Sequence, residues 1–442
     1  MVHSIPFDSQ TLIYCPEVQQ LWVTTPIVAR ALVAHVNEGV PLEALAQSMG
    51  LDLGQLSRFV GEWTSSVASQ HKMLSVRRSR AFVEVKLNVA HACNLRCIYC
   101  YAGDGSYGEP GLMDASTARA AVTFFNEHFK DTDIRLCFFG GEPLLNAKTI
   151  EATCAFASNL KTSNSFRFAI ITNGTILNAK ILSILGHYNV QVTISLDGPE
   201  VIHDKLRTFH DGAGSFDRIS SNVRRMQRRG IPLYYEAVYT SLHEKEGISR
   251  ASLKDYLERE MGFRSGVISD VTVRNGSDMT WLTPSRDDTG QGILSDPGLY
   301  WPVRYFLFKW FPQHLCTMGR LYFAVTPTGD IYPCQTLVGE RRFLMGNVLR
   351  KDYELPRTLR QMLDVLDKEK NTACKLCWAR YLCKTCPAGL YVTTGIWGIP
   401  EDYCVAQKKR IESALVQLAR IRKSPHKYQE LVRQVKDTSV IT

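Results

Sequence analysis

The chain has 442 residues, 45% of them apolar, and carries a formal net charge of +9 at pH 7. This composition predicts a folded protein of about two to four domains. No stretch reaches the roughly 18 uninterrupted apolar residues of a membrane helix, and the N-terminus lacks the basic and apolar regions of a secretory signal. The sequence therefore predicts a cytoplasmic protein with no membrane partner. Its positive charge favours a negatively charged partner, although a solvated basic surface is a commoner cause.

Cysteine is abundant, with 13 residues in the chain. In a long chain without a secretory signal, such a number indicates metal or redox chemistry instead of a disulfide framework.

Residues 1–75 combine three short extended runs with three stretches of helical periodicity between residues 28 and 63. The extended runs are Ser4 to Phe7, Thr11 to Cys15 and Leu21 to Thr24. This order predicts a winged helix-turn-helix domain. One use of that fold is DNA binding, but the predicted third helix offers few side chains for phosphates and base edges. We therefore expect no nucleic-acid partner.

The same segment resembles the peptide-recognition element of peptide-modifying enzymes and of the chaperone of pyrroloquinoline quinone synthesis. That resemblance implies that an exposed strand edge accepts the leader of a precursor peptide as an extra strand. A docking domain without any ligand is the structural alternative.

Residues 80–298 alternate apolar β-branched runs with longer amphipathic ones, the pattern of repeated βα units around a parallel sheet. The predicted strands are Val83–Val89, Ile134–Phe139, Phe166–Thr172, Val190–Leu196, Leu233–Tyr239 and Gly266–Val273. Six such units predict an α/β fold, a partial (β/α)6 TIM-like barrel. Ligands of these barrels collect at the C-terminal ends of the strands.

The loop after the first predicted strand carries Cys93, Cys97 and Cys100, three thiols within eight residues. A closed electron-transfer cluster takes four cysteine thiolates, so a C-x3-C-x2-C motif leaves one iron of a cubane free to bind a small molecule. A zinc loop is the alternative, although zinc normally takes four ligands in structural sites.

Polar or glycine-rich segments follow three further predicted strands. They are Gly140-Gly141-Glu142-Pro143 after the second, Thr172-Asn173 at the end of the third, and Ser195 with Asp197 at the end of the fourth. Arg207 comes shortly afterwards, and a guanidinium can bind a carboxylate through two hydrogen bonds.

Together these motifs resemble the radical S-adenosylmethionine (SAM) enzymes. The resemblance implies that Cys93, Cys97 and Cys100 hold a catalytic 4Fe-4S cluster whose open iron binds SAM. It further implies that SAM is cleaved to methionine and a 5′-deoxyadenosyl radical, which abstracts hydrogen from an unactivated carbon. The implied SAM-binding residues are Tyr99, Gly140, Gly141, Glu142, Pro143, Thr172, Asn173, Ser195, Asp197 and Arg207.

Residues 299–410 hold a second group of cysteines, and residues 411–442 are predicted to form a C-terminal helix. The cysteines are Cys316, Cys334, Cys374, Cys377, Cys383, Cys386 and Cys404. Their arrangement resembles the SPASM domain of radical SAM peptide maturases. This resemblance implies two auxiliary 4Fe-4S clusters, one closed by Cys374, Cys377, Cys383 and Cys404, and one held by Cys316, Cys334 and Cys386. A zinc ribbon is the alternative, because paired C-x2-C units are also a zinc signature.

Two positions depart from the SPASM pattern. Cys383 and Cys386 are separated by two residues where three are usual, which puts the ligand role of Cys386 in question. Gln335 follows Cys334 at a position where sulfatase-maturing members carry an aspartate base. Since an amide cannot take up a proton, this residue argues against formylglycine formation.

Taken whole, the chain most resembles the thioether-forming maturases of ribosomally made peptides. The resemblance implies a precursor peptide whose leader binds the N-terminal domain, and a reductant such as a flavodoxin or ferredoxin. A maturase forming carbon–carbon or carbon–oxygen crosslinks, or one acting on an enzyme-borne peptidyl cofactor, would use the same clusters. An iron–sulfur DNA-binding regulator would leave the glycine-rich segments without a role.

Overall fold

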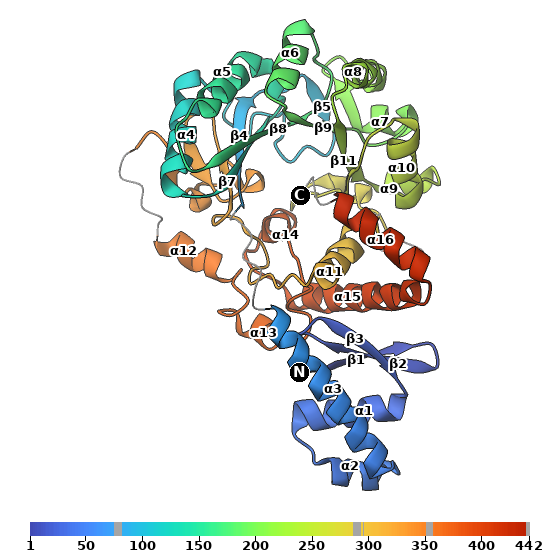
Figure 1. Ribbon diagram of the computed structural model, residues 1–442. Coiled ribbons are helices and arrows are strands. Elements are labelled where there is room, and N and C mark those ends of the chain that lie inside the picture. Colours follow the sequence, from blue (N-terminus) through green and yellow to red (C-terminus); the bar gives the residue numbers. More distant parts are fainter. Residues whose placement is uncertain (75–81, 286–292, 295, 351–356, 439–442) are drawn as a thin grey trace.

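The computed structural model describes residues 1–74, 82–285, 293–294, 296–350 and 357–438. Figure 1 shows a small N-terminal unit at one end, a large curved sheet with surrounding helices at the other, and C-terminal helices between them. Within these ranges, no helix has both the length and the apolar character needed to cross a bilayer. The predicted boundary between residues 75 and 80 falls outside the described residues.

The N-terminal unit contains the three strands and three helices that the sequence predicts. They are β1 (His3–Phe7), β2 (Gln10–Cys15), β3 (Gln20–Thr24), α1 (Pro26–Glu38), α2 (Leu42–Met49) and α3 (Leu53–Leu74). The strands form an antiparallel sheet in the order β1-β2-β3. Helix α1 begins sharply because the Thr25 hydroxyl accepts the Val28 N–H and Pro26 occupies the first turn.

Both faces of this small sheet are covered. Ile5, Phe7 and Leu12 belong to a core shared with the C-terminal helices. Ile13 and Cys15 point the other way, into a core formed with α1, α2 and α3. Within the described residues β1 and β3 each pair with β2 alone, so the outer edges of the sheet are the places left for a further strand.

The large sheet contains six adjacent parallel strands, and each overlaps its predicted range. In spatial order they are β4 (Phe82–His91), β7 (Asp133–Gly140), β8 (Ser165–Thr172), β9 (Gln191–Ser195), β11 (Leu233–Tyr239) and β12 (Gly266–Asp270). The α/β fold with a parallel sheet is therefore confirmed. A partial barrel is consistent with this order, because β4 and β12 are not paired with each other.

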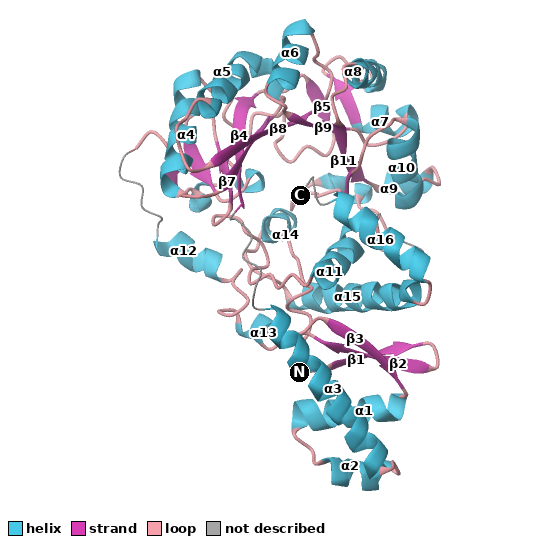
Figure 2. Ribbon diagram, in the orientation of Figure 1, coloured by secondary structure: helices cyan, strands magenta, loops and turns pink. Residues whose placement is uncertain are grey.

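Helices cover the outer face of these strands (Figure 2). They include α4 (Ala115–His128), α5 (Ala147–Ser158), α6 (Ala179–His187), α8 (Phe216–Arg228) and α10 (Arg250–Asp255). Alternate residues of β4, such as Val85 and Leu87, pack in the main core with these helices. The intervening residues, such as Lys86 and Asn88, consequently face the concave side of the sheet.

The cysteine-rich segment continues the same sheet. Strand β13 (Tyr322–Val325) pairs in parallel with β4, and β14 (Asp330–Tyr332) and β15 (Gly346–Asn347) follow antiparallel. The remaining described helices of this part include α11 (Pro297–Phe308), α12 (Arg357–Asp364), α13 (Thr372–Lys375) and α14 (Pro387–Thr394).

Two helices form where the sequence predicts one C-terminal helix. Helix α15 (Glu401–Arg422) begins before residue 411, and α16 (Pro425–Thr438) follows after a short break. The spacing of Ile411, Leu415 and Leu418 creates an apolar stripe, and all three side chains are buried in the core with α11.

Candidate active site

The three thiols of the first cysteine motif lie on the loop after β4, beside the C-terminal ends of the parallel strands. Strand β5 (Leu95–Cys97) of this loop pairs with β10 (Arg207–Phe209), which comes after α7 (Glu200–Leu206). In that register Cys97 lies opposite Arg207. The short ribbon therefore ties the thiol loop to the segment that follows the fourth barrel strand.

Hydrogen-bond donors surround the thiols. The Leu95 N–H lies 3.4 Å from the Cys93 sulfur, and the Asn173 side-chain amide lies 3.9 Å from it. Burial raises the pKa of Cys93 to about 11. Burial also raises the pKa of Cys97 to about 12. The Arg207 guanidinium opposes this shift, whereas the charges of Cys100 and Cys93 add to it. The three sulfurs are thus close enough to interact electrostatically, and donors are placed to stabilise their thiolates.

Gly140 and Gly141 lie against the backbone of the thiol loop. A Cβ at Gly141 would stand 2.3 Å from the Ala92 carbonyl oxygen, and one at Gly140 would stand 2.2 Å from that of Ala90. The Gly141 N–H donates to Ala90 O and the Glu142 N–H to Ala92 O, both at 2.8 Å. These glycines consequently allow a close approach of two backbone segments, in addition to whatever space they leave for a ligand.

The Glu142 carboxylate is fully buried and accepts three hydrogen bonds. Its Oε1 accepts the Leu144 N–H at 2.9 Å and the Thr172 hydroxyl at 2.7 Å, and its Oε2 accepts the Asn173 N–H at 2.7 Å. Pro143 starts the short 3-10 helix that Glu142 caps. Burial raises the pKa of Glu142 to about 7, and the three donors oppose this shift. Glu142 therefore joins the second and third strand ends.

Asp197 is a second buried carboxylate, and its side-chain partners lie on three segments, namely β11, β10 and the thiol loop. Oδ1 accepts the Val238 N–H at 2.9 Å and Arg207 Nη2 at 3.2 Å. Oδ2 accepts Arg207 Nε at 2.8 Å and the Tyr99 hydroxyl. Its main chain is held as well, because its N–H donates to His203 and its carbonyl accepts from His243. The structure thus brings Tyr99, Asp197 and Arg207 together in one network.

Ser195 lies on the concave face of the sheet, in register with Glu236 of β11. Glu236 is not among the site residues that the sequence predicts. Within the described residues its carboxylate has no hydrogen-bond or ion-pair partner, and its charge contributes to raising the pKa of Tyr101, which burial mainly raises. Val238, on the same face, packs against the same small apolar cluster as Tyr99 of the thiol loop. The sequence did contain a signal for Glu236. Side chains alternate between the two faces of a strand, so in the predicted strand Leu233–Tyr239 residue Glu236 falls on the face opposite Leu233 and Tyr235.

Comparison with known proteins identifies the family. Residues 87–243 match the model of the radical SAM superfamily. An uncharacterized protein of Methanocaldococcus jannaschii, MJ0907, is 30% identical over 275 residues, which are 61% of this chain and 91% of that protein. The chain belongs to the radical SAM superfamily. It is accordingly an enzyme that uses SAM and a 4Fe-4S cluster.

Two further relatives of this radical SAM enzyme carry functional names. A cysteine-type anaerobic sulfatase-maturating enzyme of Clostridium novyi is 25% identical over 323 residues, covering 66% of this chain and 84% of the relative. The sporulation killing factor maturation protein SkfB of Bacillus subtilis is 24% identical over 330 residues, covering 72% and 75%. Among solved structures, native anSMEcpe with bound AdoMet shares the fold with a TM-score of 0.60, at 17% identity, over 76% of this chain and 98% of that one.

The seven C-terminal cysteines of this radical SAM enzyme fall into two neighbourhoods. Burial raises the pKa of Cys334, and the charges of Cys386 and Cys316 raise it further. Burial likewise raises the pKa of Cys374 to about 11. The charges of its neighbours Cys383, Cys377 and Cys404 raise this pKa further. The SPASM resemblance assigns these same two groups of cysteines to two clusters, and that assignment stays a prediction. All seven are free thiols, and no three His, Cys, Asp or Glu side chains among the described residues lie close enough to hold a single metal ion.

One buried lysine, Lys368, lies beside the four-thiol set. Lys368 is 1% exposed, and its ammonium donates to the Arg380 and Cys383 carbonyl oxygens at 2.5 and 2.8 Å. Burial lowers the pKa of Lys368 to about 8, against the opposing charges of Cys383, Cys374 and Cys377. A cation beside the four-thiol set suits a group of negative charge there.

Gln335, next to Cys334, is hydrogen-bonded to a tyrosine. Its Oε1 accepts the hydroxyl of Tyr322, a residue of β13, at 2.6 Å. The amide is therefore held as a hydrogen-bond acceptor, and the two side chains contain no carboxylate that could replace the missing aspartate.

Proposed function

We propose that this radical SAM enzyme modifies a ribosomally made precursor peptide by forming a sulfur-to-carbon thioether crosslink. The observation that carries the proposal is the division of the seven C-terminal cysteines into a set of four and a set of three. Four thiolates would close one cluster, whereas three would leave an iron of the other to bind the cysteine thiolate of a substrate. That thiolate would be presented to a carbon-centred radical, and the one electron released when the carbon–sulfur bond forms would pass to an iron–sulfur cluster, which can accept it.

The SAM site in this proposal lies at the C-terminal ends of the barrel strands. Cys93, Cys97 and Cys100 would hold its 4Fe-4S cluster, and the donors at Leu95 and Asn173 fit thiolate ligands. When bound, SAM supplies the radical that removes hydrogen from the substrate. The glycines of Gly140-Gly141, together with Ser195, line the same end of the sheet, where they would contact SAM.

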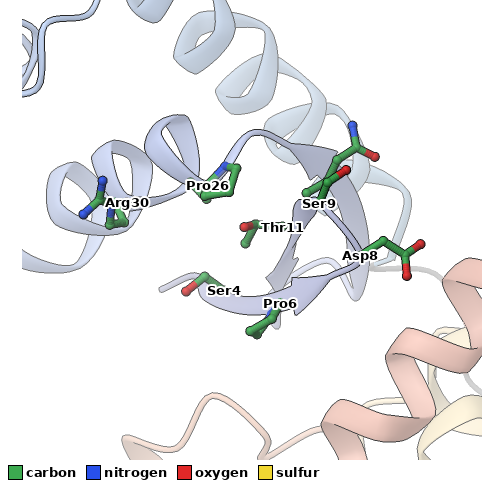
Figure 3. A pocket seen from close by; sticks show the side chains of 9 residues that line it. Ser4, Pro6, Asp8, Ser9, Thr11, Pro26 and Arg30 are labelled. Atoms are coloured by element: carbon green, nitrogen blue, oxygen red, sulfur yellow. The ribbon is translucent and has the colours of Figure 1, made fainter.

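The N-terminal sheet is the proposed binding site of the leader peptide. Within the described residues no further strand pairs with the outer edges of β1 and β3, so an extended segment could add there as a strand. A pocket of about 340 Å³ lies beside β1 (Figure 3). It is lined by residues of β1, of β2, of the turn between them and of α1, among them Ser4, Pro6, Thr11, Pro26 and Arg30. Such a pocket could receive a side chain of the added strand.

Two of the relatives have names that support a macromolecular substrate. One is a sulfatase-maturating enzyme and the other a maturation protein of a killing factor. Gln335 argues against the reaction of the first, since it supplies no base.

The test uses protein purified without oxygen, dithionite as reductant, and a short cysteine-bearing peptide encoded beside this reading frame. We expect release of 5′-deoxyadenosine and a peptide product lighter by two hydrogen atoms whose cysteine no longer reacts with a thiol-alkylating reagent. A product of the same mass that still alkylates would refute the thioether and indicate a carbon–carbon or carbon–oxygen crosslink.

Two further outcomes separate the remaining candidate functions. Modification of a protein subunit but not of the peptide would indicate a maturase of an enzyme-borne cofactor. Absence of 5′-deoxyadenosine, together with salt-dependent binding to duplex DNA, would refute the enzyme and favour a regulator. Replacing dithionite by a flavodoxin or a ferredoxin then tests the proposed reductant.

A further inference from the structure

Arg207 is predicted from the sequence to bind the carboxylate of SAM, but its guanidinium is already engaged within the protein. Nε and Nη2 donate to the two oxygens of Asp197 at 2.8 and 3.2 Å. The residue is 8% exposed. A bidentate ion pair of this kind fixes the plane of the guanidinium and uses the edge that would otherwise clasp a ligand.

Asp197 has no capacity left for a ribose hydroxyl either. A carboxylate offers about four lone-pair sites. Two of them accept from Arg207, one from the Val238 N–H, and one from the Tyr99 hydroxyl. With its carboxylate saturated and its main chain fixed by two histidines, Asp197 acts as an anchor between the barrel strands and the thiol loop.

The remaining donor group of Arg207 faces the first cysteine motif. Nη1 lies 3.9 Å from the sulfur of Cys97, which is opposite Arg207 in the β5–β10 ribbon. The guanidinium also covers the ring of Tyr99, with 5.3 Å between its central carbon and the ring centroid. Each of these contacts of the Arg207 guanidinium is therefore made either with Asp197 or with a residue of the thiol loop.

We propose that Arg207, oriented by Asp197 and Tyr99, is a positioning residue for the SAM-binding cluster and favours its reduced state through Cys97. This inference rests on the proposed assignment of that cluster to Cys93, Cys97 and Cys100. Reduction adds negative charge to an iron–sulfur cluster, and hydrogen bonds to its sulfurs together with nearby charge set its potential. A fixed cation beside one ligand in a buried site stabilises the reduced state.

The test compares Arg207→Gln and Arg207→Lys with Arg218→Gln. Arg218 is an exposed arginine that also lies over an aromatic ring, that of Phe209, at 6.0 Å. The full chain is reconstituted anaerobically and titrated with dithionite, and the paramagnetic signal that changes when SAM is added identifies the cluster. SAM affinity is measured separately by equilibrium dialysis.

We expect Arg207→Gln to shift the midpoint potential of that signal to a more negative value and to weaken retention of its iron by roughly 10- to 100-fold. Arg207→Lys, which keeps the charge, should recover part of the shift, and Arg218→Gln should match the wild type. The dissociation constant for SAM should change less than about twofold, because no SAM contact is removed.

Two results would overturn the inference. One is an unchanged potential in Arg207→Gln with SAM binding weakened by roughly 10-fold or more, which would restore the carboxylate-binding role. The other is a potential equal to that of Arg218→Gln in all variants. If Arg207→Gln does not fold, Arg207→Lys and Tyr99→Phe give the same comparison. A wild type without any SAM-responsive signal would instead refute the proposed cluster assignment itself.

Discussion

Replacing Gly141 with alanine tests whether the glycines position the thiol loop. The new Cβ would lie 2.3 Å from Ala92 O and 2.7 Å from Gly105 O, and both are backbone atoms that cannot rotate away. To reach ordinary contact at 3.4 Å, the Ala92 carbonyl must retreat by about 1.1 Å. That movement would break the 2.8 Å hydrogen bond from the Glu142 N–H. Overpacking and the lost bond together cost about 3–5 kcal/mol.

This cost falls on the loop before Cys93, so we expect displacement of the thiols without global unfolding. A misplacement of about 1 Å at a reacting centre can lower the rate roughly 100-fold. Gly141→Ala should therefore produce 5′-deoxyadenosine from SAM at about 1% of the wild-type rate. Its iron content should fall only in part, by less than the roughly four atoms of one cubane, since the displaced thiols would hold that cluster less tightly.

Gly111→Ala is the matched control. Gly111 lies on β6 (Gly111–Leu112), which pairs with the end of β4, yet a Cβ there meets nothing within 4 Å. Both variants add one methyl group beside the same loop, and only one of them creates a clash. Rates of 5′-deoxyadenosine formation that agree within about threefold between the two variants would contradict the steric argument, because that ratio corresponds to only about 0.7 kcal/mol.

Three further predictions concern other buried or inward-facing groups. The pKa of Glu142 is raised to about 7 in the folded protein, against 4.5 in the unfolded chain, so its contribution to the free energy of unfolding falls as pH rises. The loss amounts to about 2.5 kcal/mol between pH 5 and pH 8. Denaturant unfolding at these two pH values should show this loss for the wild type and not for Glu142→Gln. Lys368→Met should lower stability by about 1–3 kcal/mol and release iron, because two carbonyls lose their donor, whereas the exposed Lys370→Met should do neither. Glu236→Gln should slow substrate modification roughly 10-fold at unchanged iron content, and an unaltered rate would show that this inward carboxylate contacts no reacting group.

The sequence predicts the parallel sheet well for a local reason. Each barrel strand is a short β-branched or aromatic run followed by a helix-forming segment, so neither strand nor crossover needs distant information. The pairing of β13 with β4 could not be predicted in this way. More than 200 residues separate the two strands, and the residues of one strand do not indicate which other strand pairs with it. The same limit applies to β5 and β10, which bring Cys97 opposite Arg207.

Side-chain roles were harder to predict than side-chain positions. The resemblance to the radical SAM enzymes implied that Asp197 and Arg207 lie near the SAM site, and the structure brings both close to the thiol loop. What spacing could not show is that a main-chain N–H from β11 and a tyrosine hydroxyl from the loop already fill the carboxylate. Lone-pair saturation depends on donors from several segments and is visible only after folding.

The N-terminal sheet, where we propose that the leader binds, packs beside the four-thiol set of Cys374, Cys377, Cys383 and Cys404. The His3 ring stacks on Trp378 with 3.7 Å between centroids and also contacts Glu412 of α15 at 2.8 Å. Trp378 follows Cys377, and both pack on the core that contains Leu12 and Tyr14 of the small sheet. If a leader binds at that sheet as proposed, these packing contacts would position it relative to the four-thiol set. The reach of a bound precursor would then be decided by the length of its own chain between leader and modified cysteine.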